Sequence, residues 1–180
     1  MIDFKFIAEL EGFELDGYVP APDGGAIESG VTIASGFDLG QRSEASLPEW
    51  MQELFGIYCG VTGHDAERML NELPLHITYA QAVRVNEYAH KGAVDRLLSE
   101  WSINGIPFAC LADECQTVIA SVAFQYGSLH RRTPNFWRQV TNGDWFSALA
   151  NLRDFGDAFS TRRNKEADYL EGRLNELRYL

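Results

Sequence analysis

The sequence predicts an α+β fold, in which a mostly helical domain carries a small β lobe near its N-terminus. After residue 46, apolar positions recur at helical spacing through most of the chain. Between residues 15 and 40 the chain is rich in glycine, and the run GVTIASG reads as a short strand bounded by glycines. The length of 180 residues fits one domain. We therefore expect a single domain, with the β lobe at about 13–45 and the helical lobe formed by 1–12 and 46–180.

The first element is predicted to be a short helix from about Asp3 to Glu11. Asp3 is a good N-cap, and Gly12 is a good helix stop. The PAPDGG segment that follows predicts a turn or loop. A β region of this size is too short to fold alone, so we expect it to pack on the helical part.

The remainder of the chain is predicted to be a series of helices. SLPEWMQELFGIY has Ser46 as a candidate cap, with Pro48 in the first turn. A long helix begins with a capping box of Thr78 and Gln81 and keeps apolar spacing as far as Trp101. DECQTVIASVAFQYG is almost wholly apolar after its cap and is expected to be the buried central helix. The other predicted helices are GHDAERMLNEL, TPNFWRQVTNG, DWFSALANLRDF and STRRNKEADYLEGRLNELR.

Composition excludes several classes of function. The net charge is −11, and phosphate binding requires clustered Lys and Arg, so we expect no nucleic-acid partner. No apolar run approaches the roughly 18 residues that span a bilayer, so we expect no membrane insertion. The start of the chain does not resemble a secretory signal, so we expect synthesis in a cytoplasm.

Cysteine and histidine give no support for a metal site or cofactor. The three cysteines, Cys59, Cys110 and Cys115, contain no C-x-x-C pair, and the four histidines are scattered. We expect no metal and no cofactor, and we expect the thiols to be reduced and buried, as free cysteines commonly are.

Glu11 stands where an apolar residue would be expected. Phe4, Ile7 and Glu11 share one face of the first predicted helix, at i, i+3 and i+7. Partial burial and the nearby helix C-terminus would both favour the protonated carboxyl, which is the form a general acid needs. Spacing alone leaves a second interpretation open, in which Glu11 is a solvated helix end or pairs with an arginine.

A hydrolytic pair requires a second carboxylate. The β region offers Asp16, Asp23, Glu28 and Asp38. Asp38 follows the apolar run near Gly36 and Gly40, where the backbone can approach a ligand closely. Asp23 lies in the PDGG turn, where its ordinary role is turn formation. Thr32 is the one hydroxyl within the run VTI. As a β-branched strand residue it needs no function, but its hydroxyl could hold a water if it points into a cleft.

These residues carry a family resemblance. ELEGFELDGY followed by GVTIASGFDLG resembles the catalytic lobe of phage-type lysozymes of the T4 lysozyme kind, and it is closer still to the muramidase domain of pesticin-like bacteriocins. In those families a Glu-Gly ends the first helix and a Thr follows in a glycine-bounded strand, which Glu11-Gly12 and Thr32 match. GFDLGQ resembles the pesticin-type segment whose Asp is catalytic, here Asp38. T4-type enzymes carry their Asp before the Thr, and in that register Asp23 is the reserve.

The resemblance continues along the chain. ITYAQAVRVNEYAHKGAVDRLL resembles the inter-lobe helix of these enzymes, and VAFQYG is similar to the VFQMG of their central helix, where the Gln reaches a sugar cleft between the lobes. It therefore implies a lysozyme-like fold with substrate contacts from Gly36, Phe37, Phe124 and Gln125. Core packing remains the alternative for Phe124. The R-R-x-x-E pattern at 162–166 leaves both a salt bridge and a substrate contact open.

The function implied by this resemblance is hydrolysis of the β-1,4 bond between N-acetylmuramic acid and N-acetylglucosamine in peptidoglycan. Glu11 would protonate the leaving oxygen and Asp38 would activate water, with Thr32 helping to place that water. A lytic transglycosylase and a non-catalytic module that binds wall sugars or a protein remain alternatives. We expect a monomer that reaches the periplasmic wall after holin release, secretion or lysis, either as a phage endolysin or as an antibacterial effector with an immunity protein.

Overall fold

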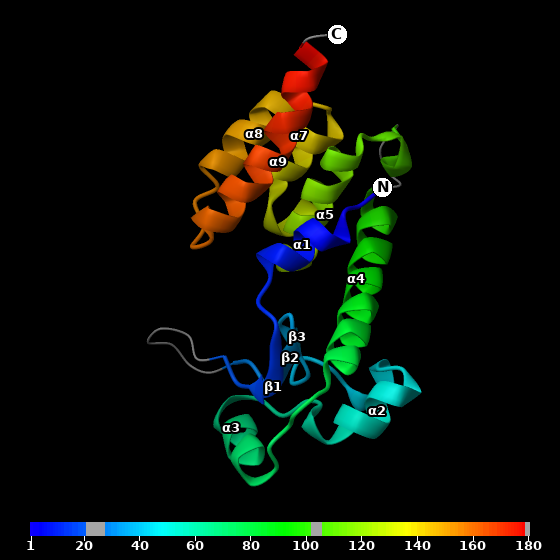
Figure 1. Ribbon diagram of the computed structural model, residues 1–180, viewed down its shortest axis with the longest axis vertical. Helices are drawn as coiled ribbons and strands as arrows, with labels where there is room; N and C mark the ends of the chain where they lie inside the picture. Colours follow the sequence, from blue (N-terminus) through cyan, green and yellow to red (C-terminus); the bar gives the residue numbers. More distant parts are fainter. Residues whose placement is uncertain (21–27, 102–105, 179–180) are drawn as a thin grey trace. The chain divides into compact units, whose positions relative to one another are not determined.

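The protein is represented by a computed structural model that describes residues 1–20, 28–101 and 106–178 (Figure 1). The α+β prediction is confirmed, since most of the described chain is helical and one small antiparallel sheet lies near the N-terminus. The chain divides into two compact units. We call residues 11–89 the sheet unit, and residues 1–10 with 90–180 the helical unit. These limits differ from the expected lobe limits, because the first helices after residue 46 belong with the sheet.

The sheet unit is built on three strands, β1 (Glu14–Tyr18), β2 (Thr32–Ala34) and β3 (Phe37–Asp38), in the order β1-β2-β3. Both pairings are antiparallel, and β2 is the central strand. Its helical parts are α2 (Glu49–Phe55), α3 (Gly63–Glu72), the first half of α4 (Tyr79–Trp101) and two 3-10 turns, Glu44–Ser46 and Gly56–Tyr58. The core of the unit includes Val31, Ile33, Leu39, Met51, Phe55, Ile77 and Val85.

Two predicted caps in this unit have different outcomes. The capping box is confirmed: the Thr78 amide donates to Oε1 of Gln81 at 2.8 Å, and the Gln81 amide donates to Oγ1 of Thr78 at 3.2 Å. The predicted cap at Ser46 is wrong, because α2 begins at Glu49 with Pro48 at its N-cap position. The Ser46 hydroxyl instead donates to the Ser43 carbonyl at 2.6 Å and closes a 3-10 turn.

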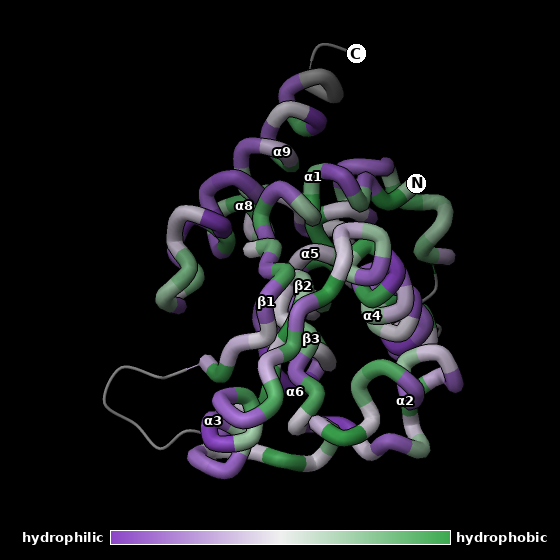
Figure 2. The backbone as a smooth tube through the Cα atoms, turned by 60° about the horizontal axis from the view of Figure 1, so that its bottom comes forward, coloured by the Kyte–Doolittle hydropathy of each residue, from purple (hydrophilic) through white to green (hydrophobic). Residues whose placement is uncertain are grey.

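The helical unit is assembled around one buried helix. Its elements are α1 (Phe4–Leu10), the second half of α4, the 3-10 turn Phe108–Cys110, α5 (Asp113–Tyr126), α6 (Leu129–Arg132), α7 (Pro134–Thr141), α8 (Trp145–Arg153) and α9 (Ser160–Arg178). Residues 115–123 of α5 are all buried, which confirms the predicted central helix. Figure 2 shows α9 coloured hydrophilic along much of its length, although two of its charged side chains are buried.

The start of α1 also confirms a local prediction. Oδ1 of Asp3 accepts a hydrogen bond from the Phe6 amide at 3.0 Å, as an N-cap does. Ile7 is fully buried in the core of the helical unit. The helix ends at Leu10, so Glu11 follows its last turn.

The cysteines only partly match the prediction of buried thiols. Cys115 is buried, Cys59 is partly exposed, and Cys110 is exposed. The prediction is wrong for Cys110. This residue is the last of the 3-10 turn Phe108–Cys110, in which Phe108 is the buried residue. Within residues 1–20, 28–101 and 106–178, no helix has both the length and the apolar character that crossing a membrane requires.

Candidate functional site

Asp38 is held in one orientation by the main chain. It is the second residue of β3 and is half-buried. Its Oδ1 accepts the Gly30 amide at 3.1 Å and the Gly40 amide at 2.9 Å. Hydrogen bonds to a charged acceptor are among the stronger ones in proteins, so this pair fixes the carboxylate. Among the described residues no hydrogen bond engages Oδ2, which is therefore the oxygen open to a ligand or water.

The two amides can converge on Asp38 because both residues are glycine. A Cβ at Gly30 would lie 2.3 Å from the Val61 carbonyl oxygen and 2.5 Å from Cα of Gly40. A Cβ at Gly40 would lie 2.6 Å from the same oxygen and from Cα of Gly30. These atoms belong to the backbone and cannot rotate away, so the approach excludes any side chain at either position.

Thr32 lies at the centre of a row of three polar side chains. It pairs with Tyr18 on β1 and with Asp38 on β3, and residues directly opposite in antiparallel strands project to the same face. Thr32 is 2% exposed, and its hydroxyl donates to the Gly30 carbonyl at 3.1 Å. The hydroxyl proton is therefore occupied, and Oγ1 remains able to accept a hydrogen bond.

Tyr18 is a member of this row that sequence reasoning missed. Burial raises the pKa of its phenol, and the negative charges of Glu14 and Asp38 raise it further. Tyr18 therefore stays protonated at neutral pH and can donate a hydrogen bond toward these carboxylates. The sequence held only part of this signal, because ELDGY could have been read as a strand but the residue that it places opposite Thr32 depends on an irregular register.

The β2–β3 turn is anchored to α4. The Ser35 amide donates to Oδ1 of Asn86 at 3.2 Å, and Nδ2 of Asn86 donates to the Ser35 hydroxyl at 2.9 Å. The turn has positive φ at Ala34 (52°) and Gly36 (88°). Gly36 has open space around it and stays a predicted substrate contact.

Phe37 has a structural role that was not expected. Its ring is 5% exposed, lies edge-on to Tyr88 at 6.1 Å, and has the Arg42 guanidinium 5.0 Å from its centroid. Its contact with substrate remains a prediction.

The predicted site residues are divided between the two units. Glu11, which is half-buried, belongs to the sheet unit together with Thr32 and Asp38. Phe124 and Gln125 belong to the helical unit. The reserve residue, Asp23, lies outside the described residues.

A comparison with known protein families shows which family this chain belongs to. Residues 1–146 match the pesticin family, described as a bacterial toxin homologue of phage lysozyme, C-terminal. The chain belongs to this pesticin family. The matched residues include Glu11, Thr32, Asp38 and Gln125, so the family relationship covers the proposed site. A search of curated proteins finds no match.

In this pesticin-family chain, the two predicted contacts on α5 have partners within the helical unit. Phe124 stacks on His90, with ring centroids 4.6 Å apart, and lies 6.3 Å from the ring of Phe4. Oε1 of Gln125 accepts a hydrogen bond from the Arg163 guanidinium. The side-chain oxygen of Gln125, a predicted substrate contact, therefore already has a partner on α9. Their contact with substrate remains a prediction.

Glu166 is the centre of a buried ionic network on α9. It is fully buried, and it accepts hydrogen bonds from Nε of Arg162 at 3.1 Å, from the Ser121 hydroxyl at 2.5 Å and from Arg163. Arg163 is 1% exposed. The salt-bridge interpretation of the R-R-x-x-E pattern is therefore confirmed for both arginines, since each contacts Glu166.

Asp157 completes this network and balances its charge. It accepts Nε of Arg163 at 2.9 Å and the Tyr126 hydroxyl at 2.6 Å. Burial would raise the pKa of Asp157, but hydrogen bonds from Tyr126, Arg163 and the Phe159 amide outweigh burial and lower it. Two arginines and two carboxylates thus share a region with no net charge, which limits the cost of burying them.

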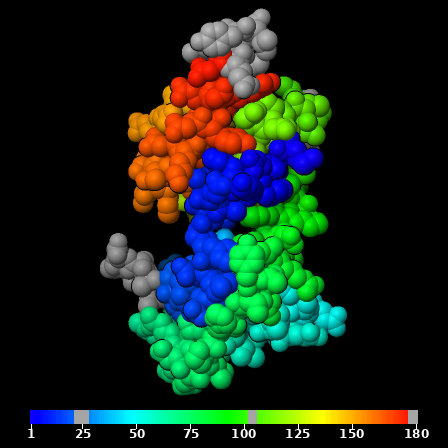
Figure 3. Space-filling model, viewed as in Figure 1, coloured from blue at the N-terminus to red at the C-terminus, as the bar shows by residue number. Residues whose placement is uncertain are grey.

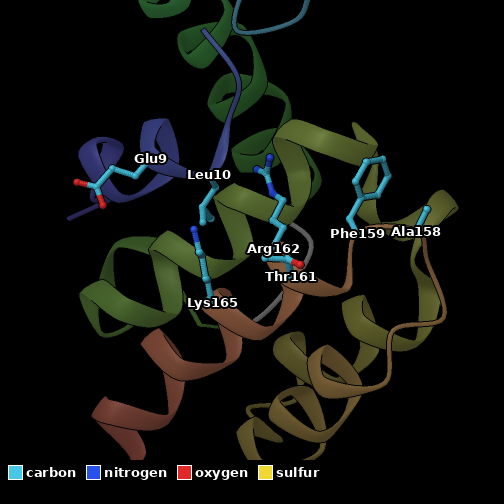
Figure 4. A pocket seen from close by; sticks show the side chains of 7 residues that line it. All are labelled: Glu9, Leu10, Ala158, Phe159, Thr161, Arg162 and Lys165. Carbon is cyan, nitrogen blue, oxygen red and sulfur yellow. The ribbon is translucent and has the colours of Figure 1, made fainter. Parts of the chain in front are cut away.

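A hollow of about 270 Å³ opens between the end of α1 and the start of α9, and it is lined by Leu10, Phe159, Arg162 and Lys165, among others (Figure 4). It lies wholly within the helical unit.

In the part of the chain that the structure describes, no group of three or more His, Cys, Asp or Glu residues is placed to hold a metal ion.

Proposed function

We propose that this pesticin-family domain is a muramidase that hydrolyses the β-1,4 bond between N-acetylmuramic acid and N-acetylglucosamine in peptidoglycan. Its homology to phage lysozyme supports this substrate. The observation that carries the proposal is the orientation of Asp38, whose Oδ1 is held by two amides while Oδ2 stays open beside Thr32. An oxygen without a protein partner beside a hydroxyl is available to accept a proton from water, as a general base must.

The row on the sheet suggests how a water molecule would be activated. The water would donate one hydrogen to Oδ2 of Asp38 and the other to Oγ1 of Thr32, whose own proton is bound to the Gly30 carbonyl. This arrangement directs a lone pair of the water at the anomeric carbon. Tyr18 would donate to the Asp38 carboxylate and help to hold it.

In the reaction, Glu11 gives its proton to the leaving glycosidic oxygen as the bond from that oxygen to the anomeric carbon breaks. The water oxygen bonds to the anomeric carbon, and its proton passes to Asp38. A base that works through water on the opposite face of the sugar predicts inversion of the anomeric configuration.

The test is wall lysis by Glu11→Gln and Asp38→Asn, with Asp16→Asn as the matched control. Asp16 lies on β1, is largely exposed and pairs with His76 at 2.7 Å, so its variant removes a carboxylate near the site without touching the row. We expect the first two variants to lose lysis at an unchanged melting temperature, and the control to retain it. Full turnover in Glu11→Gln would refute the proposal. Loss in Asp23→Asn but not in Asp38→Asn would favour the T4-like register.

Product analysis separates the two other functions. Mass spectrometry should find a reducing muramic acid end, whereas a 1,6-anhydro product would identify a lytic transglycosylase. A non-catalytic module would leave the turbidity of chloroform-treated Gram-negative cells unchanged. The family's description as a bacterial toxin homologue supports an antibacterial effector, which would act on the cell wall and imply an immunity protein.

A further inference from the structure

The strand that carries Asp38 is too short to fix its own position. Strand β3 makes only two residue pairs with β2, one of which joins Asp38 to Thr32. Side chains alternate between the two faces of a strand, so a slip of one residue in this pairing would turn Asp38 away from Thr32. The Leu39 amide donates to the Val31 carbonyl at 2.9 Å and holds the hairpin at the end opposite the turn. The turn end needs contacts of its own, because so short a hairpin is not stable alone.

The turn between β2 and β3 has a backbone conformation that an alanine does not favour. Ala34 has a φ of 52°, and among the described residues it is the one residue other than glycine with positive φ. This conformation brings the Cβ of an L-residue close to the following carbonyl oxygen. Strained backbone of this kind persists where the surrounding structure holds it, and it is concentrated at functional sites. The turn is therefore expected to have a strong external contact.

Asn86 on α4 provides that contact at the central residue of the turn. The Ser35 amide donates to Oδ1 of Asn86 at 3.2 Å, and Nδ2 of Asn86 donates to the Ser35 hydroxyl at 2.9 Å. Ser35 lies between Ala34 and Gly36, the two residues of the turn with positive φ. One amide side chain thus holds both the main chain and the side chain of Ser35. We call these two hydrogen bonds the Asn86 anchor.

The segment of α4 that carries Asn86 is itself packed against the sheet. Val85, the residue before it, is fully buried in the core of the sheet unit. Tyr88, two residues after it, lies edge-on to the ring of Phe37 on β3, with centroids 6.1 Å apart. Figure 3 shows the start of α4, in green, against β1, in blue, at the surface of the sheet unit. The anchor therefore joins the turn to a part of the helix that is fixed relative to the sheet.

We propose that Asn86 is the positioning residue for Asp38. By holding Ser35 it fixes the turn, and the turn fixes the register in which the Asp38 carboxylate lies beside Thr32. Asn86 acts through the backbone and needs no contact with substrate. The kinetic part of the proposal rests on the muramidase function, in which Asp38 is the base. Loss of the anchor should slow the chemical step, because a displacement of about 1 Å at a reacting group can lower a rate about a hundredfold.

The first experiment measures kcat and KM on soluble peptidoglycan strands. Asn86→Leu keeps the approximate size of the side chain and removes both hydrogen bonds, so kcat should fall about ten- to a hundredfold while KM changes less than about threefold. Asn86→Asp should keep kcat within about threefold of wild type, because its carboxylate can accept from both the Ser35 amide and the Ser35 hydroxyl. Ser35→Ala removes only the bond from Nδ2 and should lower kcat by about threefold.

Asn151→Leu is the matched control. Asn151 is half-buried, as Asn86 is, and its Nδ2 donates to Oε1 of Gln139 at 2.8 Å within the helical unit. The control should lower the melting temperature about as much as Asn86→Leu and keep kcat. A kcat in Asn86→Leu equal to that of wild type, or an equal fall in the control, would overturn the proposal. If Asn86→Leu does not fold, Ser35→Ala decides, and an unchanged kcat there would overturn it.

Amide hydrogen exchange followed by NMR separates failure of the anchor from failure of the muramidase function. The Gly40 amide donates to Oδ1 of Asp38 at 2.9 Å, so its exchange rate reports on the position of Asp38 without any substrate. Asn86→Leu should speed exchange at Ser35 and Gly40 by about tenfold or more, and Asn151→Leu should change neither. This result in a protein that cleaves no glycan would count against the muramidase function alone. Unchanged exchange at Gly40 in Asn86→Leu would rule out the anchor whatever the activity.

Discussion

Replacing Gly30 with Ala tests the geometry that aims Asp38. The added Cβ would lie 2.3 Å from the Val61 carbonyl oxygen and 2.5 Å from Cα of Gly40, so the backbone must move. Overpacking of this kind costs about 1–3 kcal/mol. The movement also weakens the 3.1 Å hydrogen bond from the Gly30 amide to Asp38, and a bond to a charged group contributes about 1.5–3 kcal/mol.

The two effects together predict a loss of about 2.5–6 kcal/mol in the free energy of unfolding. For a chain of this length that lowers the melting temperature by roughly 5–24 °C. Urea denaturation and thermal melting measure the loss, and wall lysis measures the effect on Asp38. We expect kcat to fall as well, because the carboxylate is no longer held by both amides.

The matched control is the same substitution at Gly92. Gly92 lies within α4, where a Cβ would meet nothing within 4 Å, so alanine should stabilise the helix by up to about 1 kcal/mol. Opposite signs for the two variants would support the argument. A Gly30→Ala protein as stable and as active as wild type would refute the reasoning about the converging amides.

Three other predictions concern the row and the ionic network. Tyr18→Phe removes one hydrogen-bond donor and should lower kcat about tenfold, with KM and melting temperature nearly unchanged. Steady-state kinetics on purified wall measure this, and an unchanged kcat would mean that Tyr18 only fills space. Glu166→Ala leaves Arg163 buried without its main partner and should lower the free energy of unfolding by about 3–5 kcal/mol. Urea denaturation measures this free energy, and a decrease of less than about 1 kcal/mol would contradict a structural role for Glu166. The pKa of Asp157 is lower in the folded chain than its unfolded value of about 3.9, so its stabilisation is complete above that pH and is lost as pH falls through the folded pKa. Asp157→Asn should therefore flatten the decline of melting temperature below about pH 4, and equal slopes would argue against it.

Features encoded within a few residues could be predicted from the sequence. The cap at Asp3, the capping box of Thr78 with Gln81, and the buried run in α5 each depend on contacts within one or two helical turns. Glu11 and Thr32 were proposed as site residues because a helix stop and a glycine-bounded strand are also local signals, on which the family resemblance rests; their roles remain predictions.

Features that depend on distant pairing could not be predicted. Tyr18 faces Thr32 only because β1 pairs with β2 through an irregular register, in which Glu14 pairs with Ala34. The short helix α6 was missed because four residues are too few to show a period.

The limits of the sheet unit differ from the predicted lobe limits for the same reason. Its helices join the sheet partly through isolated bridges, such as Gly30 with Thr62 and Asp16 with His76, that join segments more than 30 positions apart. The orientation of the Asp38 carboxylate likewise depends on the close approach of the Gly30 and Gly40 backbones to the Val61 carbonyl. Residue spacing in the sequence does not predict this approach.

The anchoring of Asp38 by peptide groups has an evolutionary consequence. Peptide N–H groups are present at almost any residue and carry no net charge. Surrounding side chains can therefore be substituted, and the ionic strength can change, without changing the orientation of this carboxylate. Only changes that separate residues 30 and 40 would do so. Substitutions should therefore be tolerated around Asp38 but not at Gly30 or Gly40. Homologues could then differ in their surface residues while the orientation of Asp38 stays constant.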